Sequence, residues 1–351
     1  MATRIGKARS QGRAGGRWPS GALGRAGPVA AGLFIDHRWG EPPTRWHPVA
    51  AFGTAMTGLE QRVYADRRDA GAVYTMAGVA LGGGAGLVLQ TLLGRRLAAA
   101  VATGLAVSGS MLDREALKVA ALLEADDLLA ARGALRALVG RSAAELDGPA
   151  ITRAVIESVA ENTVDAVTAP LLWAMAGGAP GVLAYRAINT MDAMVGHRDP
   201  RYRRFGWASA RLDDAANLVA ARVTAALTLA PLSGKRQLAA RVRAEARRHP
   251  SPNGGLIEAA FAHRLGIVIG GVNRYHGQIE DRGTLGTGRP PVPTDINRAV
   301  ALRRRVCRQL AWLLLGIEAG FTLFRATRKP SGPRRHTLKH VERHFIPEGM
   351  Q

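Results

Sequence analysis

Three kinds of residue are scarce in this chain, and each shortage narrows what the protein can be. There is one cysteine in 351 residues, Cys307, so no internal disulfide can form and a cytoplasmic face is favoured. Aromatic residues make up 5% of the sequence, and no helix-turn-helix, zinc-finger or RNA-binding signature is present. No nucleic-acid partner is therefore expected. Acidic residues are few: 27 Asp and Glu stand against 48 Lys and Arg, a formal net charge of +21.

The positive charge is concentrated in four runs, which are residues 1–27, 233–250, 298–308 and 325–344. Such runs are typical of nucleic-acid-binding proteins, or of the cytoplasmic loops that border membrane helices. Here they border apolar segments, so we favour a lipid bilayer as the partner. The chain then divides into a disordered basic N-terminal extension, a single membrane-embedded domain and a basic C-terminal tail, over residues 1–27, 28–325 and 326–351.

Long uncharged stretches predict membrane-spanning helices, and the clearest covers residues 72–93. It exceeds the roughly 20 residues that a span needs, and its glycines suit close helix packing in lipid. Residues 309–324 form a second candidate, interrupted by Glu318, whereas 215–232 contains an arginine and is a poor one. Residues 113–139 have the spacing of amphipathic helices. We find no alternating strand pattern, and expect a mainly α, multi-pass α-helical membrane protein with amphipathic cytoplasmic helices.

The segment around 165–192 predicts a re-entrant helical hairpin and not a single span. Its centre, residues 177–181, reads Gly-Gly-Ala-Pro-Gly, which is a signal for a helix to stop and restart. The arms that lead from this centre to Asp165 and to Asp192 are each about 20 Å long, short of the roughly 30 Å hydrocarbon core. Folding back at the centre would return Asn189 and Asp192 to the level of Asp165.

Carboxylates in these apolar surroundings are the main site candidates, because a charge away from water needs a partner. Glu157, Glu161 and Asp165 are spaced i, i+4, i+8 and would form one acidic stripe on a helix. Like charges at this spacing repel, and Mg²⁺ would remove the repulsion, since it commonly uses one or two carboxylates plus substrate phosphates. The alternative is an exposed acidic face with basic neighbours. We take the three as candidate metal ligands.

Basic and amide side chains nearby are candidates for binding a phosphorylated cofactor, because guanidinium groups suit phosphate. This set comprises Arg186, Asn189, Arg201, Arg204 and Asn253. For the arginines, the alternative is a basic loop at the membrane surface. Asp192 and His249 are the candidate catalytic bases. A second acidic group consists of Asp213, Asp214 and Asn217, for which helix capping is the alternative.

Several motifs occur in order along residues 29–325, and they cover 36–43, 46–49, 157–163, 177–181, 185–192, 205–214 and 249–253. In sequence and order they resemble the adenosylcobinamide-phosphate synthase family, the cobalamin-biosynthesis proteins CobD/CbiB. The resemblance implies a multi-pass cell-membrane ligase whose active site faces the cytoplasm. It would use ATP to join (R)-1-amino-2-propanol O-phosphate to a carboxyl group of adenosylcobyric acid, giving adenosylcobinamide phosphate. Other late cobalamin-biosynthesis enzymes are candidate partners.

The residues themselves suit this reaction. Amide formation from an unactivated carboxylate is uphill at neutral pH, so ATP is expected to form an acyl phosphate, with Mg²⁺ and arginines neutralising charge. A base must deprotonate the incoming ammonium, and Asp192 or His249 could serve. The alternative from another class is a non-catalytic membrane transporter or sensor with charged residues inside the membrane. Incorporation of labelled aminopropanol phosphate into a corrinoid would separate the two.

Overall fold

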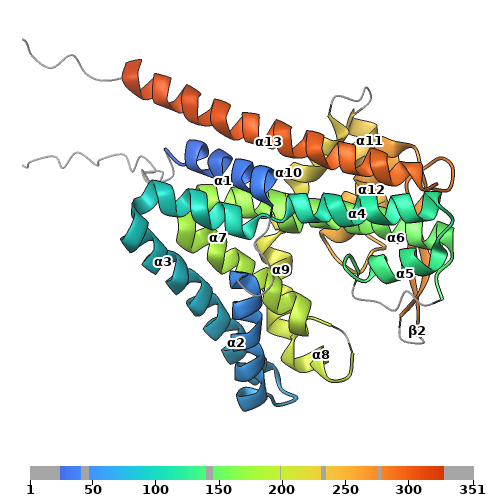
Figure 1. Ribbon diagram of the computed structural model, residues 1–351, viewed down its shortest axis with the longest axis horizontal. Helices are drawn as coiled ribbons and strands as arrows, with labels where there is room; N and C mark the ends of the chain where they lie inside the picture. Colours follow the sequence, from blue (N-terminus) through green and yellow to red (C-terminus); the bar gives the residue numbers. More distant parts are fainter. Residues whose placement is uncertain are drawn as a thin grey trace, which may run out of the picture.

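The computed structural model describes residues 24–40, 47–139, 145–197, 199–230, 235–275 and 278–327. Most of the predicted N-terminal extension, most of the predicted C-terminal tail and the motif residues 41–43 and 46 lie outside the described residues. Within them the chain is mainly helical, as predicted, and the long helices Arg68–Ala106 and Ala169–Val195 lie side by side (Figure 1).

The helices and strands are α1 (Ala26–Trp39), α2 (Pro48–Val63), α3 (Arg68–Ala106), α4 (Gly109–Glu124), α5 (Leu128–Leu135), α6 (Gly148–Thr163), a π-helix (Val164–Thr168), α7 (Ala169–Val195), α8 (Tyr202–Phe205), α9 (Trp207–Ala216), α10 (Leu218–Leu229), α11 (Lys235–Ala246), α12 (Gly254–Leu265), β1 (Ile269–Tyr275), β2 (Gln278–Leu285) and α13 (Thr294–Thr327).

In the described part of the chain, three stretches of helix are long and apolar enough to cross a membrane, and they lie in Arg68–Glu124, Gly148–Val195 and Thr294–Phe324. The predicted spans 72–93 and 309–324 fall inside α3 and α13. Large apolar side chains on these two helices point out of the fold, among them Leu92 and Trp312, which are 75% and 73% exposed. Outward apolar faces of this extent mark a surface that meets lipid or another apolar partner.

Glycines set the separation between α3 and the second half of α7, which run antiparallel. A Cβ at Gly86 would lie 2.4 Å from Pro180 Cα, and a Cβ at Gly82 would lie 2.7 Å from Leu183 O. Larger residues at these two positions would force the backbones apart. Close approach through small residues is the packing that helices use in lipid.

The chain reverses within α7. Gly178 has φ 63° and ψ −147°, a conformation that suits glycine and interrupts the helix. Beyond it, the Tyr185 hydroxyl oxygen lies 3.1 Å from Asp165 O. Along a straight helix these two residues would be about 30 Å apart. The Trp173 ring also stacks on Tyr185, with centroids 6.4 Å apart. The two arms are therefore antiparallel, with Gly178 at the tip.

Charged side chains satisfy backbone groups around this tip. Arg25 Nη1 donates to Met175 O at 3.0 Å and to Ala176 O at 2.6 Å, the carbonyls that the reversal leaves without helical partners. Glu318 Oε2 accepts from Ala26 N at 2.5 Å, at the start of α1. The acidic residue that interrupts the apolar stretch of α13 is thus a helix cap. Such caps are needed where water cannot supply the hydrogen bonds.

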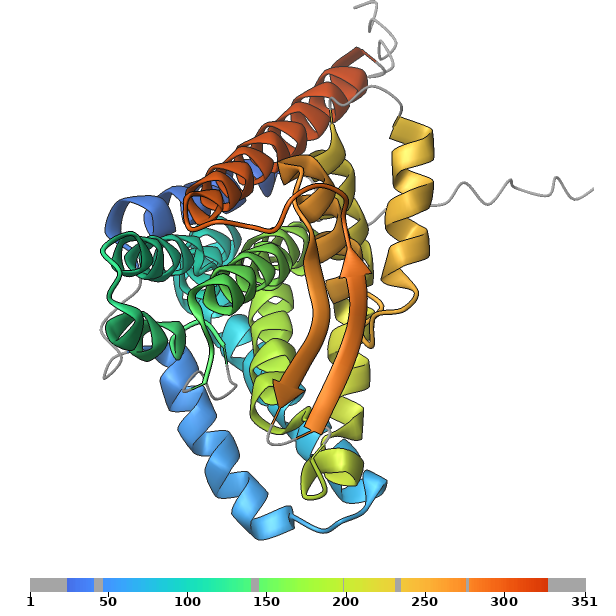
Figure 2. The same cartoon turned by 90° about the vertical axis from the view of Figure 1, so that its right-hand side faces the viewer.

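The antiparallel pair β1 and β2 is an element that the sequence analysis missed (Figure 2). Ile269 pairs with Leu285 and Gly270 with Thr284. The register shifts after Gly270, which has positive φ, as do Gly271 and Gly283. Glycines interrupt the alternation of apolar and polar residues by which a strand is recognised.

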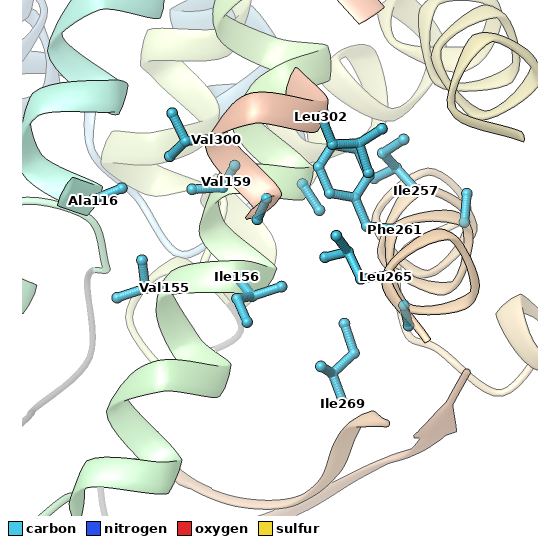
Figure 3. Close-up of a cluster of buried hydrophobic side chains, with 14 of the residues drawn as sticks. Ala116, Val155, Ile156, Val159, Ile257, Phe261, Leu265, Ile269, Val300 and Leu302 are labelled. Atoms are coloured by element: carbon cyan, nitrogen blue, oxygen red, sulfur yellow. The ribbon is translucent and has the colours of Figure 1, made fainter. Parts of the chain in front are cut away.

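One apolar core joins α6, α12, β1 and α13 and fixes their relative positions (Figure 3). Ile156 and Val159 of α6 belong to the same buried cluster as Phe261 of α12, Ile269 of β1 and Val300 of α13. The polar residues at the end of α6 are held by this core against those at the start of α12.

Candidate functional site

Polar side chains gather at the base of the hairpin, the end opposite the tip at Gly178. We name Asp165, Asp192 and Asp213, together with Asn189 and Arg186, the aspartate cluster. Asp165 interacts electrostatically with Asp192, Asp213 and Arg186. Asn189 Nδ2 donates to Asp213 Oδ1 at 3.4 Å. The reversal at the hairpin tip thus brings candidate residues from two sequence motifs together, and α9 adds Asp213.

Buried hydrogen bonds hold the aspartate cluster in place. Tyr185 donates to Asn217 Oδ1 at 2.9 Å, and Asn217 Nδ2 donates to Asp213 Oδ2 at 2.9 Å. Asp165 lies in the π-helix Val164–Thr168. Single π-turns inside helices occur frequently at functional sites, because the wider turn re-aims a side chain. Tyr185 and Asn217 are the residues that position this site, and only the tertiary contacts reveal that role.

Arg186 is the cation of the aspartate cluster. Its Nη1 donates to Asn189 Oδ1 at 3.3 Å, and its Nη2 donates to Ser108 Oγ at 3.2 Å. Arg186, Asn189, Asp165 and Asp192 are all half-buried. A ligand can therefore reach the cluster while part of it is removed from water. An arginine beside several carboxylates suits a phosphate group and a divalent cation bound together.

Burial raises the pKa of Asp213 to about 6. Its neighbour Asp214 adds to the shift, whereas hydrogen bonds from Asn217 and Asn189 oppose it. Several carboxylates in one half-buried place repel each other, and a bound cation would relieve the repulsion. Their donor atoms are oxygens, which fits Mg²⁺.

A second polar group contains Glu161, which interacts electrostatically with Asp165 of the aspartate cluster. We name Glu161, His249 and Glu258 the histidine cluster. One ligand atom from each residue lies within 4.8 Å of the other two, and no other trio of His, Cys, Asp or Glu in the described part of the chain is this close. His249 Nε2 lies 3.5 Å from Glu258 Oε1, and both side chains are almost completely buried. The sequence analysis did not select Glu258, whose position in an apolar helix was the available signal.

The three acidic residues predicted as a stripe have three different surroundings. Glu157 Oε1 accepts from Gly270 N at 3.0 Å and lies 4.0 Å from Arg153 Nε, so this residue ties α6 to β1. Glu161 belongs to the histidine cluster, and Asp165 belongs to the aspartate cluster.

The predicted phosphate-binding arginines after α7 contact other elements. Arg201 Nη2 lies 3.0 Å from Glu60 Oε1 of α2, and its guanidinium sits over the Tyr64 ring at 4.5 Å. Arg204 Nη1 lies 3.6 Å from Asp66 Oδ2, between α2 and α3. These contacts direct both guanidinium groups to the end of α2, whereas Arg186 alone of the three predicted arginines belongs to the aspartate cluster.

Asn253 joins three segments beside His249. Its Nδ2 donates to Asp214 O at 2.8 Å, and its Oδ1 accepts from Arg222 Nη1 at 3.0 Å. Arg222, which made residues 215–232 a poor span, thus has a partner inside the fold. Asn253 fixes the turn that carries His249 against α9 and α10.

The third basic run, residues 298–308, is partly used within the fold. Arg303 Nη2 and Arg304 Nε both donate to Asp113 Oδ2 at 2.6 Å, and Arg303 is buried. This contact ties α13 to α4. The charge count of the run gave no sign of it, because the partner lies far away in the sequence.

Fold and site together define a class: a helical protein with membrane-length apolar helices and a half-buried polar site at the base of a helical hairpin. Comparison with known proteins then gives the family. The model of the CobD/Cbib protein family matches residues 29–303, and the chain belongs to that family.

Several bacterial relatives are similar to this chain, and each carries the name cobalamin biosynthesis protein CobD. The protein from Mycobacterium tuberculosis (strain ATCC 25618 / H37Rv) is 50% identical over 296 residues, covering 82% of this chain and 93% of the relative. Those from Geobacter metallireducens and Halalkalibacterium halodurans are 41% and 40% identical, covering 75% and 79% of this chain and 87% and 91% of theirs. No solved structure gives a significant match.

Proposed function

We propose that this protein is an ATP-dependent ligase of cobalamin biosynthesis. It joins (R)-1-amino-2-propanol O-phosphate to a carboxyl group of adenosylcobyric acid and gives adenosylcobinamide phosphate. The observation that carries the proposal is the aspartate cluster with Arg186, placed at the base of the hairpin in a chain of the CobD/Cbib family. It offers groups for a metal, a phosphate and a proton within one site.

The roles follow from the chemistry of each side chain. ATP supplies the driving force that amide formation needs at neutral pH, and Mg²⁺ neutralises the phosphate charge. Asp165 and Asp213 are the proposed oxygen ligands of the cation, with Glu161 next to them. Arg186 and Asn189, which are hydrogen-bonded to each other, hold and orient a phosphate.

A base must take the proton of the incoming ammonium, and we assign this step to Asp192. Asp192 lies at the half-buried edge of the aspartate cluster, where a substrate amine can reach it. His249, the other candidate base, is enclosed by carboxylates of the histidine cluster. We leave Arg201, Arg204 and Glu157 out of the site, because their contacts hold other elements together.

The proposed setting is the cell membrane, crossed several times, with the site facing the cytoplasm that supplies ATP. Three membrane-length apolar helices and outward apolar side chains on α3 and α13 support this. The hairpin of α6 and α7 is then re-entrant, and its polar base lies at the cytoplasmic level. The corrinoid substrate, and other late enzymes of the pathway, would approach that face.

The test is turnover by purified protein in detergent, followed as ATP-dependent incorporation of labelled aminopropanol phosphate into adenosylcobyric acid. We expect Asp165→Asn to lower the rate at least about 100-fold, because the metal and its phosphate would lose their central carboxylate. Asp69→Asn is the matched control and should keep full activity, since Asp69 forms an exposed ion pair with Arg67. Absence of any product with the unaltered protein would instead favour a transporter or a sensor.

A further inference from the structure

The geometry of the histidine cluster fits metal coordination better than a hydrogen bond. His249 Nε2 and Glu258 Oε1 are 3.5 Å apart. A good N–H···O hydrogen bond is about 2.7–3.2 Å long. Two ligand atoms that each lie about 2.1 Å from one tetrahedral ion are about 3.4 Å apart. The Glu161 oxygen lies within 4.8 Å of both other atoms and would be the third ligand of such an ion.

A second buried histidine, His263 in α12, gives an internal comparison. His263 Nε2 lies 3.0 and 3.1 Å from the two carboxylate oxygens of Glu245, which are ordinary hydrogen-bond distances. Like His249, His263 has a nearly fully buried side chain. No third carboxylate, cysteine or histidine in the described residues comes within ligand spacing of that pair. The two histidine–glutamate pairs therefore differ in distance and in the third ligand.

The backbone around the histidine cluster leaves room for Glu161 and orients the imidazole. A Cβ at position 254 would lie 2.8 Å from Glu161 Oε1, so glycine at this position lets the carboxylate reach the cluster. His249 Nδ1 lies 3.2 Å from Ser251 N, which donates to it, and 3.4 Å from Ser251 O. Binding a metal through Nε2 would place the ring proton on Nδ1, where the Ser251 carbonyl is within reach to accept it, and ligand histidines are commonly oriented in this way.

The donor set distinguishes this cluster from the aspartate cluster. It combines one imidazole nitrogen with carboxylate oxygens, whereas the aspartate cluster offers oxygen alone. Mg²⁺ prefers oxygen ligands, and imidazole favours Zn²⁺, Co²⁺ and related first-row transition ions. The two clusters meet at Glu161, which interacts electrostatically with Asp165.

We propose that Glu161, His249 and Glu258 form a second metal site, which takes a divalent first-row transition ion in preference to Mg²⁺. The ion ties α6, the turn before α12 and α12 itself together next to the aspartate cluster. Metal binding at this site can be tested without ATP or corrinoid.

The experiment is a Co²⁺ titration of the full chain in detergent, stripped with a chelator and held in excess Mg²⁺. Visible absorption reports Co²⁺ bound to nitrogen and oxygen ligands. We expect one Co²⁺ per chain, which Zn²⁺ displaces and Mg²⁺ does not. His249→Gln and Glu258→Gln should each weaken Co²⁺ binding at least about 100-fold. Losing a residue that only hydrogen-bonds to a metal ligand already lowers metal affinity about 10–100-fold.

Two variants serve as controls. His263→Gln should bind Co²⁺ as the unaltered protein does, since His263 contacts Glu245 and lies outside the histidine cluster. Asp165→Asn should also keep the Co²⁺ site while losing turnover, which separates this proposal from the ligase proposal. Gly254→Ala, which changes no ligand, should weaken Co²⁺ binding by displacing Glu161, and it provides a second measurement if His249→Gln does not fold.

Lack of Co²⁺ binding by the unaltered protein in excess Mg²⁺ would overturn the proposal. Equal Co²⁺ affinity in the unaltered protein and in folded His249→Gln would overturn it as well. Loss of the Co²⁺ spectrum in Asp165→Asn would assign the ion to the aspartate cluster and would count against a separate site.

Discussion

Asp213 is the buried carboxylate of the aspartate cluster, and its pKa links the site to pH. Its pKa is raised from the ordinary value of 3.8 to about 6, chiefly by burial. In the absence of a cation, the folded protein therefore holds this proton between about pH 4 and pH 6, where the unfolded chain has released it. The stability that the neutral form contributes is lost as the pH rises through about 6.

Cation binding should show the opposite pH dependence. A neutral Asp213 does not attract a cation, so Mn²⁺, used as a spectroscopic substitute for Mg²⁺, should bind the aspartate cluster weakly at pH 5. Binding should strengthen through about pH 6 and level off above it. Electron paramagnetic resonance of Mn²⁺ on His249→Gln protein, which lacks the histidine cluster, measures this. Asp213→Asn should flatten the profile, and an unchanged profile in that variant would refute the assignment.

At the scale of elements, glycines decide how closely α3 and α7 approach. Gly82 faces α7, where a Cβ would lie 2.7 Å from both Leu183 O and Ala187 Cβ, whereas Gly84 has nothing within 4 Å.

Gly82 and Gly84 should therefore respond in opposite ways to replacement by alanine. Gly82→Ala should destabilise the fold by about 1–3 kcal/mol, because the helices must separate. Gly84→Ala should be neutral or stabilising by up to about 1 kcal/mol, since alanine is the better helix former. Thermal unfolding in detergent, followed by circular dichroism, measures both. Similar unfolding temperatures for the two variants would contradict the packing described.

The tip of the hairpin gives a second element-scale prediction. Gly178 has a positive φ that side chains disfavour, whereas Gly177 next to it has open space and an ordinary backbone. Gly178→Ala should therefore cost about 1 kcal/mol or more, and Gly177→Ala should cost little. The unfolding free energies of the two variants, compared in one detergent, check this. A cost at Gly177 as large as at Gly178 would argue against a reversal there.

At the scale of the whole molecule, apolar side chains cover the outside of α3 and α13, while a few charged side chains, such as Glu258 and Asp295, are buried. Val88 on α3 and Ile317 on α13 are exposed, and so is Leu129 on the short helix α5. In the proposed membrane setting, the first two meet lipid and the third meets water.

Spin labels at these positions would separate the two environments. Cysteine replacing Val88 or Ile317 should give a label that oxygen relaxes more than a water-soluble nickel complex does. Cysteine replacing Leu129 should give the reverse. The native Cys307 is buried and should stay unlabelled. Labels at Val88 and Ile317 that respond mainly to the nickel complex would exclude a membrane-spanning arrangement of these helices.

The local signals in the sequence predicted several elements well. Pro149 is the second residue of α6, a position where proline is favoured, and Asp147 caps this helix start by accepting from Ala150 N at 2.9 Å. The Gly-Gly-Ala-Pro-Gly segment predicted the reversal that occurs at Gly178. Both signals act within one or two turns of helix, so the chemistry of a few adjacent residues is enough. The sheet of β1 and β2 escaped prediction, because its glycines remove the period of two.

The sequence by itself determined the apolar helices, their breaks and the family, because these depend on composition, glycine and proline positions, and ordered motifs. Tertiary structure alone decided the grouping of the acidic residues. The spacing of Glu157, Glu161 and Asp165 would place them near one face of a regular helix. An α-helix nevertheless rotates about 40° at each step of four residues, and a π-turn begins at Val164. Each carboxylate therefore meets the partners that packing brings to its own side of the helix: β1, α12 or the returning arm of α7.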